Sequence, residues 1–85
     1  MKVLKFSASW CVGCKTLQAI IDTLDTDVNI QSVDIEDEFE IARQYNIRAV
    51  PTLVMVDDTG TEMKRISGAM SKDKLQEWLD ETIGK

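Results

Sequence analysis

Cys11 and Cys14 are the only cysteines in this chain of 85 residues, and two residues separate them. In a helix, positions i and i+3 lie on the same face, one turn apart, with Cα atoms about 5 Å from each other. This separation falls within the range of about 4.4–6.8 Å that a disulfide bond tolerates. The spacing therefore predicts a pair of thiols that can close to a disulfide and open again with little movement of the backbone.

The position of the pair predicts different roles for the two thiols. An apolar segment, residues 2–7, precedes the pair, and a helical pattern begins at Cys11. The N-terminus of a helix favours an anion, because unpaired N–H groups and the positive end of the helix dipole lie there. We therefore expect Cys11 to be the nucleophilic thiolate, and Cys14 to resolve the mixed disulfide by attacking Cys11.

Two other roles for the pair remain open at this point. Two thiolates supply half of a zinc site, but the chain has no histidine and no third cysteine to complete it. Alternatively, the chain is a non-catalytic binding module whose cysteines are idle or bridge a metal. A Cys-x-x-Cys pair beside a strand–helix–strand pattern favours redox chemistry over both. We expect no metal, and no cofactor other than the Cys11–Cys14 disulfide itself.

Length, charge and composition limit the class of protein. The length fits a single domain over residues 1–85. A net charge of −5, without a basic cluster, argues against nucleic-acid binding. No apolar run approaches the roughly 20 residues that span a bilayer, and two cysteines are too few for a disulfide scaffold. We expect a cytoplasmic monomer that binds neither nucleic acid nor a membrane.

Hydrophobic periodicity predicts seven elements in the order βαβαββα. Strands are expected over residues 2–7, 28–35, 52–56 and 62–67, and helices over 11–24 and 37–45. A last helix is expected after the N-cap Ser71, with a buried stripe that ends at Ile83. This order predicts an α/β fold with a four-stranded mixed sheet flanked by three helices on its two faces. Phe39 and Ala42 are expected to face the core. Lys64 and Arg65 mark the fourth strand as an edge strand.

Three motifs in combination resemble the thioredoxin family. Residues 10–14 (Trp-Cys-Val-Gly-Cys) resemble its active-site motif, residues 49–52 (Ala-Val-Pro-Thr) its cis-proline loop, and residues 68–72 the glycine loop before the last helix. The resemblance covers essentially the whole chain. It implies a thioredoxin-like fold of minimal, glutaredoxin-like size that begins at what is normally the second strand.

The resemblance also implies a function, a thiol–disulfide oxidoreductase that reduces protein disulfides through Cys11 and Cys14. Such a protein accepts electrons from a thioredoxin reductase-like flavoprotein, and contributes to electron transport and cell redox homeostasis. The alternative within related proteins is a glutaredoxin-like reductase that depends on glutathione. The sequence lacks a tyrosine between the cysteines and a glycine pair followed by aspartate in the later loop, which argues against this alternative.

Four further residues receive substrate-binding roles from the resemblance. Trp10 would shield the thiols. A cis bond before Pro51 would place the backbone of Val50 where it can pair with an extended substrate. Gly68 would allow the substrate backbone to approach closely.

The chain departs from the family pattern at two places. The residues between the cysteines are Val12 and Gly13, where the family usually has Gly-Pro. Without the proline a backbone N–H is free to stabilise the thiolate, so we expect a less reducing couple than that of a typical thioredoxin.

The second departure lies in the strand before the motif. Lys5 stands where the family has a buried aspartate, and Ser32 stands where it often has a lysine. We expect Lys5 and Asp34 to form a reversed ion pair behind Cys14, in which the cation lowers a thiol pKa. The alternative is that Lys5 extends to solvent.

Overall fold

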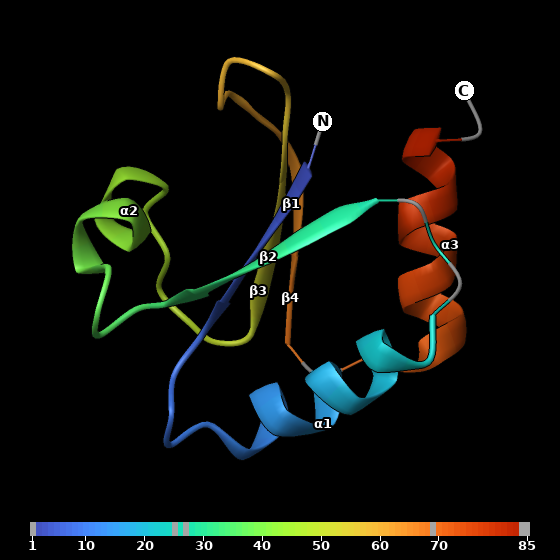
Figure 1. Cartoon of the computed structure of the whole chain (residues 1–85), viewed down its shortest axis with the longest axis horizontal. Coiled ribbons are helices and arrows are strands. Elements are labelled where there is room, and N and C mark those ends of the chain that lie inside the picture. The colour runs from blue at the N-terminus through green and yellow to red at the C-terminus, as the bar shows by residue number, and fades with distance from the viewer. Residues whose placement is uncertain (1, 25, 27, 69, 84–85) are drawn as a thin grey trace.

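The computed structural model describes residues 2–24, 26, 28–68 and 70–83, and it confirms the expected order of elements (Figure 1). The elements are β1 (Lys2–Ser7), α1 (Val12–Asp22), β2 (Asn29–Asp34), α2 (Phe39–Gln44), β3 (Thr52–Val56), β4 (Glu62–Ser67) and α3 (Lys72–Ile83). Ser71 caps α3, because its hydroxyl accepts the N–H of Lys74 at 3.2 Å.

The four strands form one mixed sheet in the order β2-β1-β3-β4. β1 pairs with β2 in parallel, and β3 pairs antiparallel with both β1 and β4. All five residues of β3 are buried, as expected for a continuous apolar strand inside a sheet. β4 lies at an edge, which confirms the expectation drawn from its charged residues.

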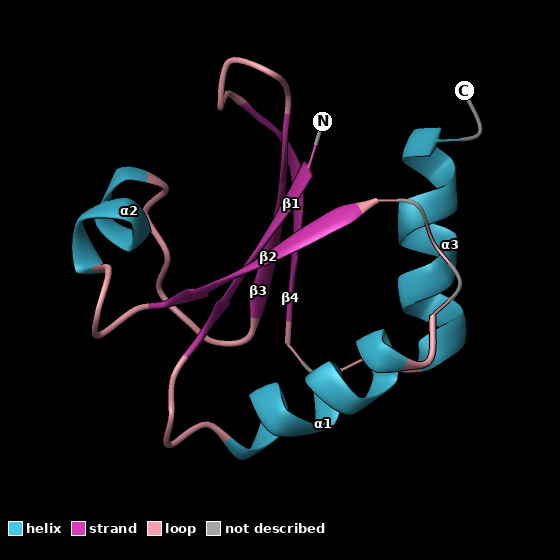
Figure 2. Ribbon diagram, in the orientation of Figure 1, coloured by secondary structure: helices cyan, strands magenta, loops and turns pink. Residues whose placement is uncertain are grey.

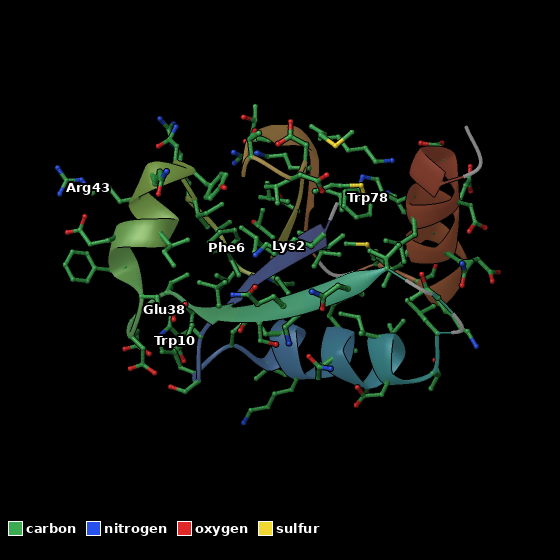
Figure 3. The ribbon with its side chains drawn as sticks, turned by 45° about the horizontal axis from the view of Figure 1, so that its top comes forward. Lys2, Phe6, Trp10, Glu38, Arg43 and Trp78 are labelled. Carbon is green, nitrogen blue, oxygen red and sulfur yellow. A yellow bond between two sulfur atoms is a disulfide. The ribbon has the colours of Figure 1, made fainter. Side chains whose placement is uncertain are left out.

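The helices cover both faces of the sheet (Figure 1). α1 and α3 pack on one face, where buried residues from every layer form the larger core: Val3, Leu17, Leu53, Met55, Leu75, Trp78 and Leu79. α2 packs on the other face over Leu4, Phe6, Val33, Ala42, Val54 and Val56. In Figure 3 the labelled side chains of Phe6 and Trp78 lie between the sheet and these two helix layers. The alternation along β1 thus supplies both cores from one strand.

The expectation that Phe39 faces the core is wrong. Its side chain is 58% exposed, whereas Ala42 is buried. Ile41, Ala42 and Tyr45 pack against the sheet from α2 and its C-cap. At 100° per residue, these three positions define an arc that leaves Phe39 on the outer side of the helix.

The topology brings three loops to one end of the sheet. β3 starts beside the end of β1, because the two strands are antiparallel, and β4 ends beside the start of β3. The β1–α1, α2–β3 and β4–α3 connections therefore meet at the lower end of the sheet in Figure 2. These connections carry the cysteine motif, the proline motif and the glycine motif.

Candidate active site

The cysteine pair forms a disulfide at the start of α1. Cys11 is the N-cap of the helix, with an extended backbone (φ −87°, ψ 106°), and Cys14 lies in its first turn. The two Cα atoms are 5.2 Å apart, which confirms that this spacing suits a disulfide. The N–H of Cys14 donates to Sγ of Cys11 at 3.1 Å. This N–H would stabilise negative charge on Cys11 once the disulfide is reduced.

The disulfide is embedded in an apolar cluster. Cys11 is 7% exposed and Cys14 is 4% exposed. Both pack with Ala8, while Ile35 and Val50 lie against the cluster from the other loops. Burial in apolar surroundings disfavours a thiolate. The helix N-terminus is therefore the feature that can offset this cost at Cys11.

The proline loop lies against the start of α1. The Val50–Pro51 peptide bond is cis, as the resemblance implied. A Cβ atom built on Gly13 would lie 3.7 Å from Cδ of Pro51, so the loop and the motif are in van der Waals range. The N–H of Gly68 donates to the carbonyl of Pro51 at 2.9 Å. The fold thus brings Cys11, Pro51 and Gly68 together from three distant segments.

Gly68 occupies a conformation that suits glycine. Its φ of +89° lies in the left-handed region, which residues with a Cβ rarely adopt. Apart from its two chain neighbours, no atom of the described residues lies within 4 Å of a Cβ built at this position. The space above Gly68 is therefore open to another chain.

Two large apolar side chains flank the buried disulfide and are themselves exposed. Trp10 is 65% exposed and Val12 is 76% exposed; Figure 3 shows Trp10 at the margin of the molecule. Exposed apolar side chains gathered at one place are typical of interaction surfaces. The shielding role of Trp10 stays a prediction. Sequence reasoning did not assign a contact role to Val12, although an apolar residue at the first exposed position of a helix was a usable signal.

Lys5 does not extend to solvent, so that alternative is wrong. The residue is 5% exposed, and its ammonium donates to Oε1 of Gln18 on α1. Burial lowers the pKa of Lys5 below its ordinary value of 10.5, and the carboxylate of Asp22 partly offsets this shift. The amide of Gln18 in turn donates to Asp22 at 2.8 Å.

The expected ion pair between Lys5 and Asp34 is also wrong. The structure describes both side chains and shows no ion pair between them. Oδ1 of Asp34 instead accepts the N–H groups of Glu36 at 2.8 Å and Asp37 at 3.3 Å. Because the chain turns directly after β2, these neighbouring N–H groups lie within hydrogen-bond distance of the carboxylate and satisfy it locally.

A small cavity nevertheless connects the residues that were expected to act together. Lys5, Cys14, Gln18 and Asp34 all line a cavity of about 250 Å³. Sequence reasoning missed Gln18 as the partner of Lys5. Its signal was the spacing of four residues from Cys14, which places both side chains on the same face of α1.

The described residues form neither a cluster of potential metal ligands nor a helix that could span a membrane. Within residues 2–24, 26, 28–68 and 70–83, no three Cys, Asp or Glu side chains are placed to hold a metal ion. Over the same residues, no helix is long and apolar enough to cross a membrane.

A disulfide at a helix N-terminus, beside a cis-proline loop and a glycine in a left-handed conformation, defines a thiol–disulfide oxidoreductase. The chain belongs to the thioredoxin family, because the family model described as Thioredoxin matches residues 1–81. The metal-bridging and glutathione-dependent alternatives are not favoured by this match.

Individual relatives agree with the family assignment. The chain is 36% identical over 76 residues to a thioredoxin of Chlamydia caviae, with 86% of this chain and 74% of that protein covered. It is 37% identical over 81 residues to thioredoxin H2-1 of rice (Oryza sativa subsp. japonica), covering 92% of this chain but only 57% of the rice protein. A solved mutant thioredoxin from Halobacterium salinarum superimposes with a TM-score of 0.84 at 30% identity, over 93% of this chain and 71% of that one. The chain thus spans between about half and three quarters of these relatives.

Proposed function

We propose that this protein transfers an electron pair from its Cys11–Cys14 dithiol to disulfide bonds of other proteins. The observation that carries the proposal is the N-cap position of Cys11, whose Sγ accepts the N–H of Cys14. The Cys11 thiolate attacks one sulfur of the substrate disulfide and releases the other as a thiolate. The Cys14 thiolate then attacks Sγ of Cys11, which restores the Cys11–Cys14 disulfide and frees the second substrate thiolate. The two substrate thiolates take protons from solvent, so the substrate gains the two electrons that the dithiol loses.

The substrate surface is formed by the residues around the disulfide. Exposed Trp10 and Val12 offer apolar contact area on one side of Cys11. Val50 packs against the cysteine cluster and precedes the cis bond to Pro51, and we expect its backbone to pair with an extended substrate segment. The open space over Gly68 lets a second backbone approach. This surface suits unfolded or extended segments of many proteins.

The cellular setting follows as a further part of the proposal. Continued turnover requires a reductant, and we expect a thioredoxin reductase-like flavoprotein to supply it. The protein would act as a monomer in the cytoplasm, and would contribute there to electron transport and cell redox homeostasis. Two cysteines that are both in the redox site agree with a reducing compartment.

The residues between the cysteines set the expected redox potential. Val12 and Gly13 leave every N–H of the first turn free to face the Cys11 sulfur, and the N–H of Cys14 does so. Stabilising the thiolate stabilises the reduced form, so we expect a potential above about −270 mV, the thioredoxin value. Equilibration with a glutathione buffer measures it. A potential at or below that value would contradict the expectation.

The proposed activity is tested by the reduction of insulin disulfides in the presence of dithiothreitol. The wild type should accelerate reduction above dithiothreitol alone, and Cys11→Ser should not. Reduced Cys14→Ser, freed of dithiothreitol before it is mixed with insulin, should instead accumulate a mixed disulfide, because the resolving thiol is gone and no other thiol is present to cleave it. A wild-type rate equal to the dithiothreitol background would refute the proposal. Faster turnover with glutathione than with a thioredoxin reductase would favour the glutaredoxin-like alternative.

A further inference from the structure

The cavity behind the disulfide holds a buried cation. Lys5 is 5% exposed and shares this cavity with the buried side of Cys14. Cys14 and Gln18 are four residues apart on α1, so their Cβ atoms lie about 5–6 Å from each other. The ammonium of Lys5 donates to Oε1 of Gln18, and Lys5, Gln18 and Cys14 line the same cavity, so the positive charge lies at the cavity that Cys14 also lines.

A cation in this place is costly to maintain. Burial of an ammonium has a large desolvation penalty unless hydrogen bonds and opposite charges compensate for it. The chain compensates in part, through Gln18 and through Asp22, which receives the Gln18 amide at 2.8 Å. The proposed transfer of electrons needs Cys11, Cys14 and the substrate surface, and Lys5 takes part in none of its bond changes. Simple packing would be served by a methionine or leucine at this position.

We infer that Lys5 is a positioning residue for the second half of the reaction, in which its ammonium stabilises the thiolate of Cys14. Gln18 accepts a hydrogen bond from this ammonium at the cavity that Cys14 also lines. The inference rests on the proposed function for its purpose, since it is the resolving step that needs a Cys14 thiolate. Its physical content, a lowered thiol pKa at Cys14, is independent of any substrate.

The step balances without a further reactant. Cys14 loses its proton to solvent through the cavity, and the resulting thiolate is held by the positive charge of Lys5. Its sulfur then bonds to Sγ of Cys11, and the bond between Cys11 and the substrate sulfur breaks. The departing substrate thiolate takes a proton from solvent, so Lys5 itself neither gains nor loses one.

Other charges face the same cavity and set the strength of the effect. Lys15 lines the cavity from α1, and Asp22, further along the same helix and outside the cavity lining, acts on Lys5 through its negative charge. Asp34 lines the cavity from β2, but its carboxylate is held by the N–H groups of Glu36 and Asp37. Asp22 raises the pKa of Lys5 against the lowering by burial. Asp22 therefore helps to keep Lys5 charged.

The test measures the thiol pKa of Cys14 directly. In a Cys11→Ser background Cys14 is the only thiol, and its Cβ chemical shift or thiolate absorbance can be followed against pH. A nearby opposite charge favours the ionised form of a thiol, so Lys5→Met should raise the pKa of Cys14 and reduce the thiolate fraction near neutral pH, by about tenfold if the charge acts at the lower end of the range known for close ion pairs. Lys5→Arg should restore most of the lost thiolate, because it keeps the charge. Lys2→Met is the matched control on the same strand and should leave the titration unchanged.

A second measurement does not depend on a variant at position 5. With Lys5 intact, its Cε chemical shift should show an inflection at the same pH as the titration of Cys14, because the coupling between two charges is reciprocal. An unchanged Cys14 pKa in a folded Lys5→Met variant, or the absence of this inflection, would overturn the inference. Both results are independent of insulin reduction, so a failure of the proposed function and a failure of this inference can be told apart.

Discussion

Replacing Lys5 by methionine should make the oxidised protein more stable. Lys5 is 5% exposed, and one hydrogen bond, to Gln18, is the contact of its ammonium that compensates for the lost water. Replacing buried ionic groups by apolar ones of similar volume often stabilises a protein by about 1–4 kcal/mol. The substitution also removes the hydrogen bond from the ammonium to Gln18, and loss of a hydrogen bond to a charged group costs about 1.5–3 kcal/mol. Part of this cost is recovered, because the half-buried amide of Gln18 can hydrogen-bond to water instead. The balance is a gain of about 1 kcal/mol, or roughly 4–8 °C in Tm for a chain of this size.

The gain should depend on pH in a defined direction. Burial holds the pKa of Lys5 in the folded state below 10.5, its ordinary value. Between the folded pKa and 10.5 the unfolded wild type binds more protons than the folded wild type, so its free energy of unfolding increases with pH. The Lys5→Met variant lacks this contribution. Its advantage should therefore be largest near neutral pH and should shrink as the pH approaches 10.5.

Urea unfolding of the oxidised proteins, followed by circular dichroism, measures both effects. The comparison is made near neutral pH and at about pH 10, close to the ordinary lysine pKa. The control is Lys2→Met, which removes the same charge from the same strand. Lys2 donates to Gln31 at 3.1 Å in an exposed position, so this variant should change the free energy of unfolding by less than about 0.5 kcal/mol. A Lys5→Met variant less stable than the wild type, or an advantage that does not vary with pH, would refute the account of Lys5 as a buried and poorly compensated cation.

Three further predictions concern the frame and the substrate surface. Leu53→Ala, in the fully buried strand β3, should lower the free energy of unfolding by about 2–5 kcal/mol in urea, with an unchanged m-value. Asp57 accepts hydrogen bonds from the hydroxyl of Thr59 and from the N–H groups of Thr61 and Thr59, which hold its pKa below 3.8. Its contribution to stability is therefore present above that value and is lost as pH falls through the folded pKa, so Asp57→Asn should flatten the acid limb of stability against pH. Gly68→Ala should cost about 1–2 kcal/mol through its positive φ, and should lower kcat/KM for insulin more than for a small disulfide; equal losses would contradict a role in substrate approach.

The fold was predictable because local patterns and topology agree. A strand, a helix and a strand in close sequence predicted the parallel pair β1–β2, and the continuous apolar run of β3 predicted its place inside the sheet. Phe39 was misplaced because α2 is short. Over six residues, a face through Phe39 and Ala42 and a face through Ile41, Ala42 and Tyr45 are both possible, and packing against the sheet selects the second.

The candidate site was predictable only in part. Cys11 and Cys14 are close in sequence, so helix geometry alone places them at disulfide distance. Lys5 and Asp34 were expected to pair because adjacent strands carry them. Which partner a lysine chooses depends, however, on the rotamers and competing groups of every element around it. In the folded protein the ammonium of Lys5 donates to Gln18, and the carboxylate of Asp34 accepts a backbone N–H from the turn after β2.

The sequence by itself determined the redox chemistry, since two thiols one helical turn apart at the start of a helix can form a disulfide wherever that helix lies. Only the tertiary structure decided what surrounds them. It brought Pro51 and Gly68 to the same end of the sheet as Cys11, and it buried Lys5 beside Cys14. The physical reason is the sequence distance over which each interaction acts, since helix spacing and capping involve only a few neighbouring residues. The burial of a charge and the meeting of three loops depend on how the whole sheet is assembled.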